Sequence, residues 1–377
     1  MIIVAAILAI FVYGMIAAML GTILPDLSKR FNLTPSQNGN IALAQAIGLI
    51  VASISVGPLI DNEGKKVGIL LGLALIAIAL FLLPKSKSYG QIAIYMLLLG
   101  LGGGIIVTGA NALVSDIGAN QRAAVLNFLN LFFGLGGLAT PFISGNLLGS
   151  NSQRLCYLTA ILTVITLGAY VIAPIPGPTG EHGFQFSQAG ALLGSPALWL
   201  LSLLMFLYVA CEVGVWNWLT RHLIAQGIPE HKALNILSLG FALGLLLGRI
   251  AVAPLFQKVT PPNVTLIAAV LMAVTTFLAL RTTEPKLAWV TVFFAGIAMA
   301  PVFPTTLAMV GGAFQTATAT AMGIVITFGW VGLAVSLRII GAIAGDDPKK
   351  LRGALLLIPG ASVIMIAVNL VLRPLLP

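Results

Sequence analysis

The chain has 377 residues, of which 59% are hydrophobic and only 8% are charged. That leaves too little polar surface to cover a soluble globule of this size, so the composition indicates an integral membrane protein. The formal net charge of +9 comes from basic residues scattered singly or in pairs, which excludes a nucleic-acid-binding patch. Cys156 and Cys211 both lie in apolar runs, so the cysteines suggest neither a disulfide framework nor a metal site.

Twelve apolar runs are long enough to cross a bilayer, which takes about 20 residues of helix. The first run has no basic segment before it and no small-residue cleavage site after it, so it predicts a membrane helix rather than a signal peptide. The sequence therefore predicts an all-α protein with twelve transmembrane helices, at 2–24, 39–60, 67–84, 90–114, 122–148, 154–175, 196–220, 232–256, 262–281, 286–310, 315–343 and 351–374.

An internal repeat divides the predicted helices into two groups. The longest polar interruption, Pro174 to Pro196, separates the sixth run from the seventh. A shift of 196 positions aligns 57–59 with 253–255, and near-constant offsets align further segments. Chance similarity between glycine-rich helices is the alternative explanation. We expect two six-helix bundles, joined by a linker, with these bounds: 1–175, 176–195 and 196–377.

A charged turn containing glycine, 57–66, joins the second and third runs. Asp61 is an acceptor at a helix end, Gly64 lets the chain reverse, and Lys65 and Lys66 carry positive charge near the headgroups. We expect these residues to form a latch that holds one conformation and releases another. Their ordered pattern closely resembles the loop signature of the major facilitator superfamily. That resemblance implies two six-helix pseudo-repeats around a central cavity, which rock about a site near the membrane midplane.

The resemblance and the basic residues disagree about orientation. The resemblance places the turn in the cytoplasm, which puts both termini on the cytoplasmic side of a bacterial inner membrane. The positive-inside rule favours the opposite orientation. We follow the motif, and the positive excess at the other end could attract anionic solutes. The basic residues at that end are Lys29, Arg30, Lys85, Lys87, Arg154, Arg221, Lys232, Arg281, Lys286, Lys349, Lys350 and Arg352.

Charged residues within apolar helices are costly, so they are functional candidates. Glu212 is the only carboxylate well inside a predicted helix. It could bind a hydroxylated solute, carry a transported proton, or pair with a basic residue. Arg249 is expected to tie helix ends together or support gating, whereas Arg338 either extends to the interface or supplies a counter-charge.

Uncharged polar and aromatic residues form a second group of candidates. Amides donate and accept hydrogen bonds at hydroxyls, and indole rings stack on the C–H faces of sugars. For any one residue, the alternative is an amide that bridges helices or a tryptophan at the interface. The predicted cavity residues are Asn40, Gln45, Asn111, Asn127, Asn130, Glu212, Trp216, Asn217 and Trp330.

Several segments resemble the fucose permease branch of the superfamily, the fucose–galactose–glucose proton symporters. They are 109–116, 122–136, 212–219, 248–249 and 300–305. The branch implies sugar and proton transport, but its two acidic coupling positions correspond to Gly21 and Val107 here. Either Glu212 has taken over coupling, or the protein is a facilitator driven only by its substrate gradient.

We therefore expect a transporter of a monosaccharide or related polyol that works by alternating access, and not an enzyme. Two alternatives are a carrier or exporter of an organic anion that uses an intramembrane arginine, and a transport-inactive sensor or scaffold. We expect a sugar, a proton and the bilayer as partners, a monomeric state, and no cofactor or metal, because His182, His222 and His231 are predicted loop residues without ligand spacing. The predicted gating residues are Asp61, Gly64, Lys65, Lys66, Asp116, Arg122 and Arg249.

Overall fold

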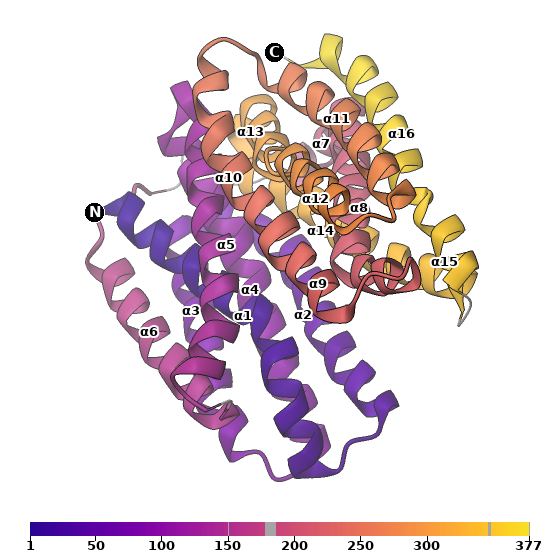
Figure 1. Cartoon of the computed structure of the whole chain (residues 1–377). Helices are drawn as coiled ribbons and strands as arrows, with labels where there is room; N and C mark the ends of the chain where they lie inside the picture. The colour runs from indigo at the N-terminus through magenta and orange to yellow at the C-terminus, as the bar shows by residue number, and fades with distance from the viewer. Residues whose placement is uncertain (150, 178–185, 346–347, 377) are drawn as a thin grey trace. The chain divides into compact units, whose positions relative to one another are not determined.

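The computed structural model describes residues 1–149, 151–177, 186–345 and 348–376 (Figure 1). Regular structure in these ranges is entirely helical. Twelve helical spans are long and apolar enough to cross a membrane, and they follow the twelve predicted runs in order. The prediction of an all-α membrane protein with twelve spans is therefore confirmed for the part of the chain that is described.

The first six spans are single helices whose starts are set by local sequence. Thr34 and Gln37 form a reciprocal capping box, in which each side chain accepts a hydrogen bond from the backbone N–H of the other residue, at 3.2 and 2.9 Å. Asn151 caps the sixth span by accepting a hydrogen bond from the Arg154 N–H at 2.9 Å. The helices are α1 (Ile2–Phe31), α2 (Pro35–Glu63), α3 (Lys65–Leu82), α4 (Tyr89–Ile117), α5 (Arg122–Asn146) and α6 (Ser152–Ile172).

The last six spans include three that are interrupted. A π-helical segment, η3, breaks the eighth span, Pro301 separates two helices of the tenth span, and two helices make up the twelfth. Helix α7 (Phe186–Leu193) lies in the predicted linker, of which 178–185 fall outside the described residues. The other elements are α8 (Pro196–Ala225), α9 (Glu230–Asn235), η3 (Ile236–Ala242), α10 (Leu243–Val252), α11 (Pro261–Arg281), α12 (Pro285–Met299), α13 (Val302–Ala313), α14 (Thr318–Ala344), α15 (Pro348–Leu355) and α16 (Leu357–Leu372).

Close packing at glycine follows the internal repeat. A Cβ atom at Gly48 of α2 would overlap a backbone oxygen of α4, and one at Gly100 of α4 would overlap a backbone oxygen of α2. Gly244 of α10 and Gly296 of α12 lie 196 positions after Gly48 and Gly100. A Cβ atom at Gly244 would overlap a backbone oxygen of α12, and one at Gly296 would overlap a backbone oxygen of η3. Matched backbone approaches at the predicted offset confirm the pseudo-repeat, because chance similarity of composition would not conserve the contacts.

The chain forms two compact units that do not coincide with the two sequence halves. Unit 1 consists of Met1–Ala119, Leu129–Gly190 and Phe314–Thr327. Unit 2 consists of Asn120–Phe128, Ala191–Ala313 and Phe328–Pro377. The beginning of α5 therefore belongs with helices of the second half, and the beginning of α14 with helices of the first. The functional division at 176–195 stays a prediction.

Candidate functional site

In unit 1, Asp61 binds the beginning of α14. Its Oδ1 accepts a hydrogen bond from the Ala319 N–H at 3.1 Å, and its Oδ2 accepts from the N–H and the hydroxyl of Thr320 at 2.8 and 2.6 Å. The first N–H groups of a helix have no partner within the helix and carry partial positive charge. Asp61, at the end of α2, therefore caps a helix that begins more than 250 positions later in the sequence.

The two lysines of the same turn bind other helices of unit 1. Lys65 forms an ion pair with Asp116 of α4, with Nζ 2.8 Å from Oδ2, and the two side chains are 5% and 17% exposed. Lys66 donates hydrogen bonds to the carbonyls of Val171 and Ala173, at 2.7 and 3.1 Å, where α6 ends. Gly64 allows both contacts because its φ of 92° makes the sharp reversal between α2 and α3.

Small residues bring α2 and α14 close together. A Cβ atom at Gly57 would overlap the Thr320 backbone, and one at Gly323 would overlap the Ser53 carbonyl. These contacts and the Asp61 hydrogen bonds follow each other along the two helices. We call this set, Ser53, Gly57, Asp61, Thr320 and Gly323, the α2–α14 seam.

A reciprocal contact occurs in unit 2, at the beginning of α5. The Asn127 amide donates to the Ala123 carbonyl at 2.8 Å and to the Thr305 hydroxyl of α13 at 3.3 Å. Arg122 lies beside Gly312, where an added Cβ would be 3.9 Å from a guanidinium nitrogen. Arg122 and Asn127 thus contact a helix of the second sequence half. The predicted cavity residue Asn127 lies with the predicted gating residue Arg122.

In unit 1, Asn111 and Asn130 are brought together inside the bundle. The Asn130 amide donates to Asn111 Oδ1 at 2.9 Å, and the Asn111 amide donates to the Val107 carbonyl at 2.7 Å. Both side chains are buried. Gln45 is also buried and donates to the Ile16 carbonyl at 3.4 Å, whereas Asn40 is exposed near the beginning of α2.

In unit 2, Glu212 is the centre of a mixed polar and aromatic cluster. It interacts electrostatically with Arg249 of α10 and lies beside Tyr208 and Trp216 of its own helix, α8. Arg249 is buried, Glu212 is half-buried, and the Trp216 ring is 38% exposed. The Trp216 ring meets Phe241 edge to face, with centroids 5.3 Å apart. We call these five residues the Glu212 cluster.

Sequence reasoning missed two members of the Glu212 cluster, the apolar Phe241 and the polar Tyr208, and Tyr208 is the one that bears on binding. Its hydroxyl is fully buried and makes no hydrogen bond of good geometry in this conformation, although it lies next to the carboxylate. Positions 208, 212 and 216 are spaced by four, so they share one face of α8. That spacing was the available signal. The structure also favours the pairing interpretation for Glu212, because Arg249, in the last turn of α10, interacts with it electrostatically.

Other predicted residues lie apart from these contacts. Asn217 is exposed and donates to the Val213 carbonyl at 2.9 Å, and Trp330 is half-buried in α14. Arg338 is exposed. The predictions that His222 and His231 lie in loops are wrong. Helix α8 continues to Ala225 and buries the His222 ring, and His231 lies in helix α9. His182 lies outside the described residues.

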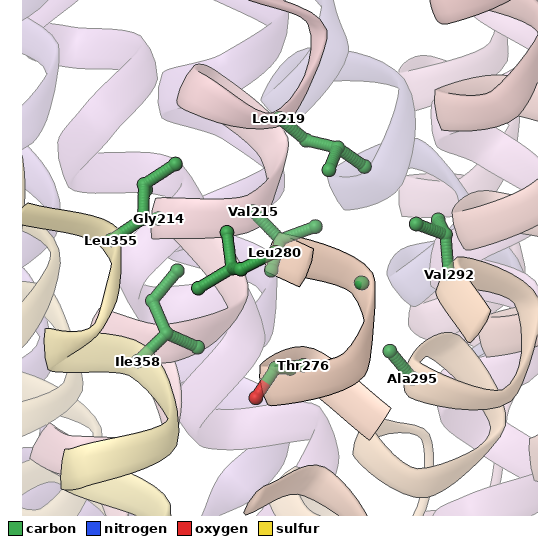
Figure 2. Close-up of a pocket in the computed structure, with 10 residues that line it drawn as sticks. Gly214, Val215, Leu219, Thr276, Leu280, Val292, Ala295, Leu355 and Ile358 are labelled. Atoms are coloured by element: carbon green, nitrogen blue, oxygen red, sulfur yellow. The ribbon is translucent and has the colours of Figure 1, made fainter. Parts of the chain in front are cut away.

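A pocket in unit 2 is lined almost entirely by apolar side chains (Figure 2). Val215 and Leu219 come from α8, Leu280 from α11 and Val292 from α12. The Thr276 hydroxyl, the lining group that could donate a hydrogen bond, already donates to the Met272 carbonyl at 2.6 Å. This pocket therefore offers little to a hydroxylated solute, in contrast to the Glu212 cluster.

Comparisons with known proteins show the family of the chain. The family model of the Major Facilitator Superfamily matches residues 6–336. The glucose/mannose transporter GlcP of Bacillus subtilis is 23% identical over 353 residues, which cover 89% of this chain and 86% of that protein. Bypass of stop codon protein 6 of Saccharomyces cerevisiae is 23% identical over 277 residues, or 66% of this chain, and the match spans only 55% of the yeast protein's length.

The fold is also similar to a solved structure. The crystal structure of FucP, a Major Facilitator Superfamily transporter in the outward conformation, has a TM-score of 0.85 at 17% sequence identity, and the match covers 98% of each chain. At that identity the likeness shows the fold alone. With the family match and the twelve spans, it identifies the protein: the chain belongs to the Major Facilitator Superfamily and is an integral membrane transporter, not an enzyme.

Proposed function

We propose that the protein transports a monosaccharide or related polyol by alternating access, in a bacterial inner membrane with both termini in the cytoplasm. The Glu212 cluster carries this proposal. It combines a carboxylate, a phenol hydroxyl and a partly exposed indole on one face of α8. Sugars are recognised by that combination, because carboxylates and phenols bind hydroxyls while the indole covers an apolar ring face.

Each member of the cluster has a distinct role in this proposal. Glu212 accepts hydrogen bonds from sugar hydroxyls, and Tyr208 offers a hydroxyl that has no partner of good geometry. Trp216 stacks on the solute and is itself held by its edge-to-face contact with Phe241. Arg249 fixes the carboxylate from α10. In unit 1, the buried Asn111 and Asn130 amides form a second group of candidates, in which Asn111 holds Asn130 in place.

Two observations bear on the choice of solute. GlcP matches most of this chain, and its name describes a glucose/mannose transporter. An organic anion would need an uncompensated cation, but Arg249 already faces Glu212. A neutral hydroxylated solute therefore suits the cluster better than an anion does. A sensor or scaffold with this fold is the remaining alternative, and saturable flux would eliminate it.

If sugar transport is coupled to protons, we propose that Glu212 is the residue that carries the proton. Gly21 and Val107 occupy the two positions at which the fucose permease branch carries acidic residues, so neither position supplies a carboxylate here. The choice is therefore between symport that uses Glu212 and facilitated diffusion. Both fit a carboxylate held by a neighbouring arginine.

Uptake into proteoliposomes tests the proposal. Labelled glucose, galactose and fucose would be supplied with and without an imposed proton gradient, with neutral sugars and carboxylates as competitors. Saturable uptake that neutral sugars inhibit supports the proposal, and accumulation only with the gradient assigns symport. Absence of flux for every sugar, with folded protein shown by a cooperative melting transition, would refute the sugar assignment. Inhibition by carboxylates alone would favour the anion carrier.

A further inference from the structure

Three helix ends of unit 1 meet at one backbone carbonyl, remote from the latch and the seam. The Arg30 guanidinium, at the end of α1, donates to the Pro84 carbonyl just beyond α3, at 3.3 and 3.4 Å. Gln153, in the first turn of α6, donates to the same carbonyl at 3.2 Å. The end of α1, the end of α3 and the beginning of α6 are therefore held side by side.

Five basic residues lie at this meeting point or within three positions of it along the chain. Lys29 and Arg30 come from α1, Lys85 and Lys87 follow α3, and Arg154 lies in the first turn of α6. All five are exposed. We call them the basic cluster. Such a concentration of positive charge on three adjoining helix ends creates a strong local attraction for anions.

The charge of the basic cluster is not balanced by nearby carboxylates. Asp26 is the acidic residue of the described unit 1 at this end of the helices, and its carboxylate accepts hydrogen bonds from the N–H and the hydroxyl of Ser152. It thereby caps α6, and its one negative charge offsets only part of the five positive charges. Asp61, Glu63 and Asp116 lie where α2 and α4 end, at the opposite end of the bundle. Within the described residues, no ion pair is formed by the five cations.

An apolar surface begins immediately below the basic cluster. Helix α3 packs against α6, and the rings of Phe81 and Tyr157 meet across them with centroids 6.2 Å apart. Ile78, Leu158 and Ile161 on the same two helices are 40–53% exposed. Phe81 precedes Lys85 by one helical turn, and Tyr157 follows Arg154 by one turn. The cations and the exposed apolar side chains are therefore continuous along both helices.

A cationic patch above an apolar, membrane-facing surface fits an anionic amphiphile. We propose that the basic cluster binds the phosphate headgroup of an anionic phospholipid, whose acyl chains lie along the Phe81 and Tyr157 surface of α3 and α6. A free phosphate ion would use the cations but would gain nothing from the apolar surface. Basic residues at a membrane surface attract anionic lipids by about fivefold each in binding constant. Five basic residues on adjoining helix ends therefore give a site that prefers anionic to zwitterionic phospholipids.

Lipid exchange in nanodiscs tests this proposal. Purified protein would be equilibrated with mixed phosphatidylglycerol and phosphatidylcholine, and the ratio of bound lipids would be measured by native mass spectrometry. We expect K29Q/K85Q/R154Q to reduce the preference for phosphatidylglycerol by at least about tenfold. Arg30 is left intact because it anchors the three helix ends. The charge-conserving variant K29R/K85R/R154K should keep the wild-type preference.

A matched control removes three exposed cations from elsewhere, as K258Q/K286Q/R373Q. This variant should change the preference less than about twofold, because these residues lie outside the basic cluster. The proposal would be overturned if the preference survived in K29Q/K85Q/R154Q, or if the control lost it equally. Displacement of bound phosphatidylglycerol by inorganic phosphate at millimolar concentration would also overturn it, in favour of a free-anion site. Melting curves confirm that each variant is folded.

Discussion

Replacing Asp61 by alanine should open the α2–α14 seam. The carboxylate accepts two backbone hydrogen bonds and one hydroxyl hydrogen bond from the beginning of α14. Hydrogen bonds to a charged group contribute about 1.5–3 kcal/mol each, and a carboxylate at a helix N-terminus adds about 0.3–1 kcal/mol. Because Asp61 is half-buried and water can replace part of these bonds, we expect a net loss of about 2–3 kcal/mol. That loss would lower the population with a closed seam, relative to the open state, by about 30- to 150-fold.

Distances between spin labels measure this population. Labels at N62C and T316C, two exposed positions of unit 1 on either side of the seam, should give a short distance in the otherwise unchanged protein. D61A should add a longer distance, and E63Q is the matched control, because Glu63 is exposed and neighbours Asp61 in the same turn. An unchanged distance distribution in D61A would refute the role given to the carboxylate. An equal change in E63Q would show that loop charge, rather than capping of α14, is responsible.

Three further predictions concern the same seam and the Glu212 cluster. Gly323→Ala should open the seam as Asp61→Ala does, since the added Cβ would overlap a backbone oxygen of α2, whereas Gly341→Ala should leave the labels unmoved because its Cβ meets only a side chain at 3.5 Å. Glu212→Gln should weaken sugar binding by about tenfold in titration calorimetry, because a charged acceptor becomes neutral, and Glu284→Gln should not alter binding. Trp216→Phe should retain most of the sugar affinity, whereas Trp216→Ala should lower it about fivefold to tenfold. Equal losses of affinity in the two variants would exclude stacking.

The twelve spans could be read from the sequence because membrane helices need long apolar runs, whatever their neighbours. The repeat was visible for a similar reason. Gly100 and Gly296, which the repeat aligns, occupy positions where only a hydrogen atom fits between two helices, so the offset is preserved although the surrounding residues differ. These features depend on local composition or on single backbone contacts, and a linear sequence records both.

The candidate site was harder to predict because residue type does not fix tertiary partners. Asn111 and Asn130 were grouped as cavity amides, and the structure pairs them. Asn127 was assigned to the same group, but it contacts Thr305, because the beginning of α5 packs with the second sequence half. His222 was misplaced because the polar pair Arg221 and His222 ended the apolar window at 220, whereas α8 continues through both residues to Ala225.

The beginnings of α5 and α14 each pack with helices of the other sequence half, but the side chains that hold them differ in charge. A shift of 196 positions puts Gln257 in place of Asp61, so the beginning of α5 lacks an acidic cap from the corresponding turn. One of its described side-chain contacts is the hydrogen bond from the Asn127 amide to the Thr305 hydroxyl at 3.3 Å, which joins two neutral groups and is long. Asn127→Ala should therefore destabilise the closed state by about 0.5–1.5 kcal/mol. With the same spin labels, the ratio of short-distance to long-distance populations should change by no more than about tenfold. A shift as large as that of Asp61→Ala would mean that the two contacts share the closing energy equally. A smaller shift would mean that the Asp61 cap on α14 decides how readily this end of the transporter opens.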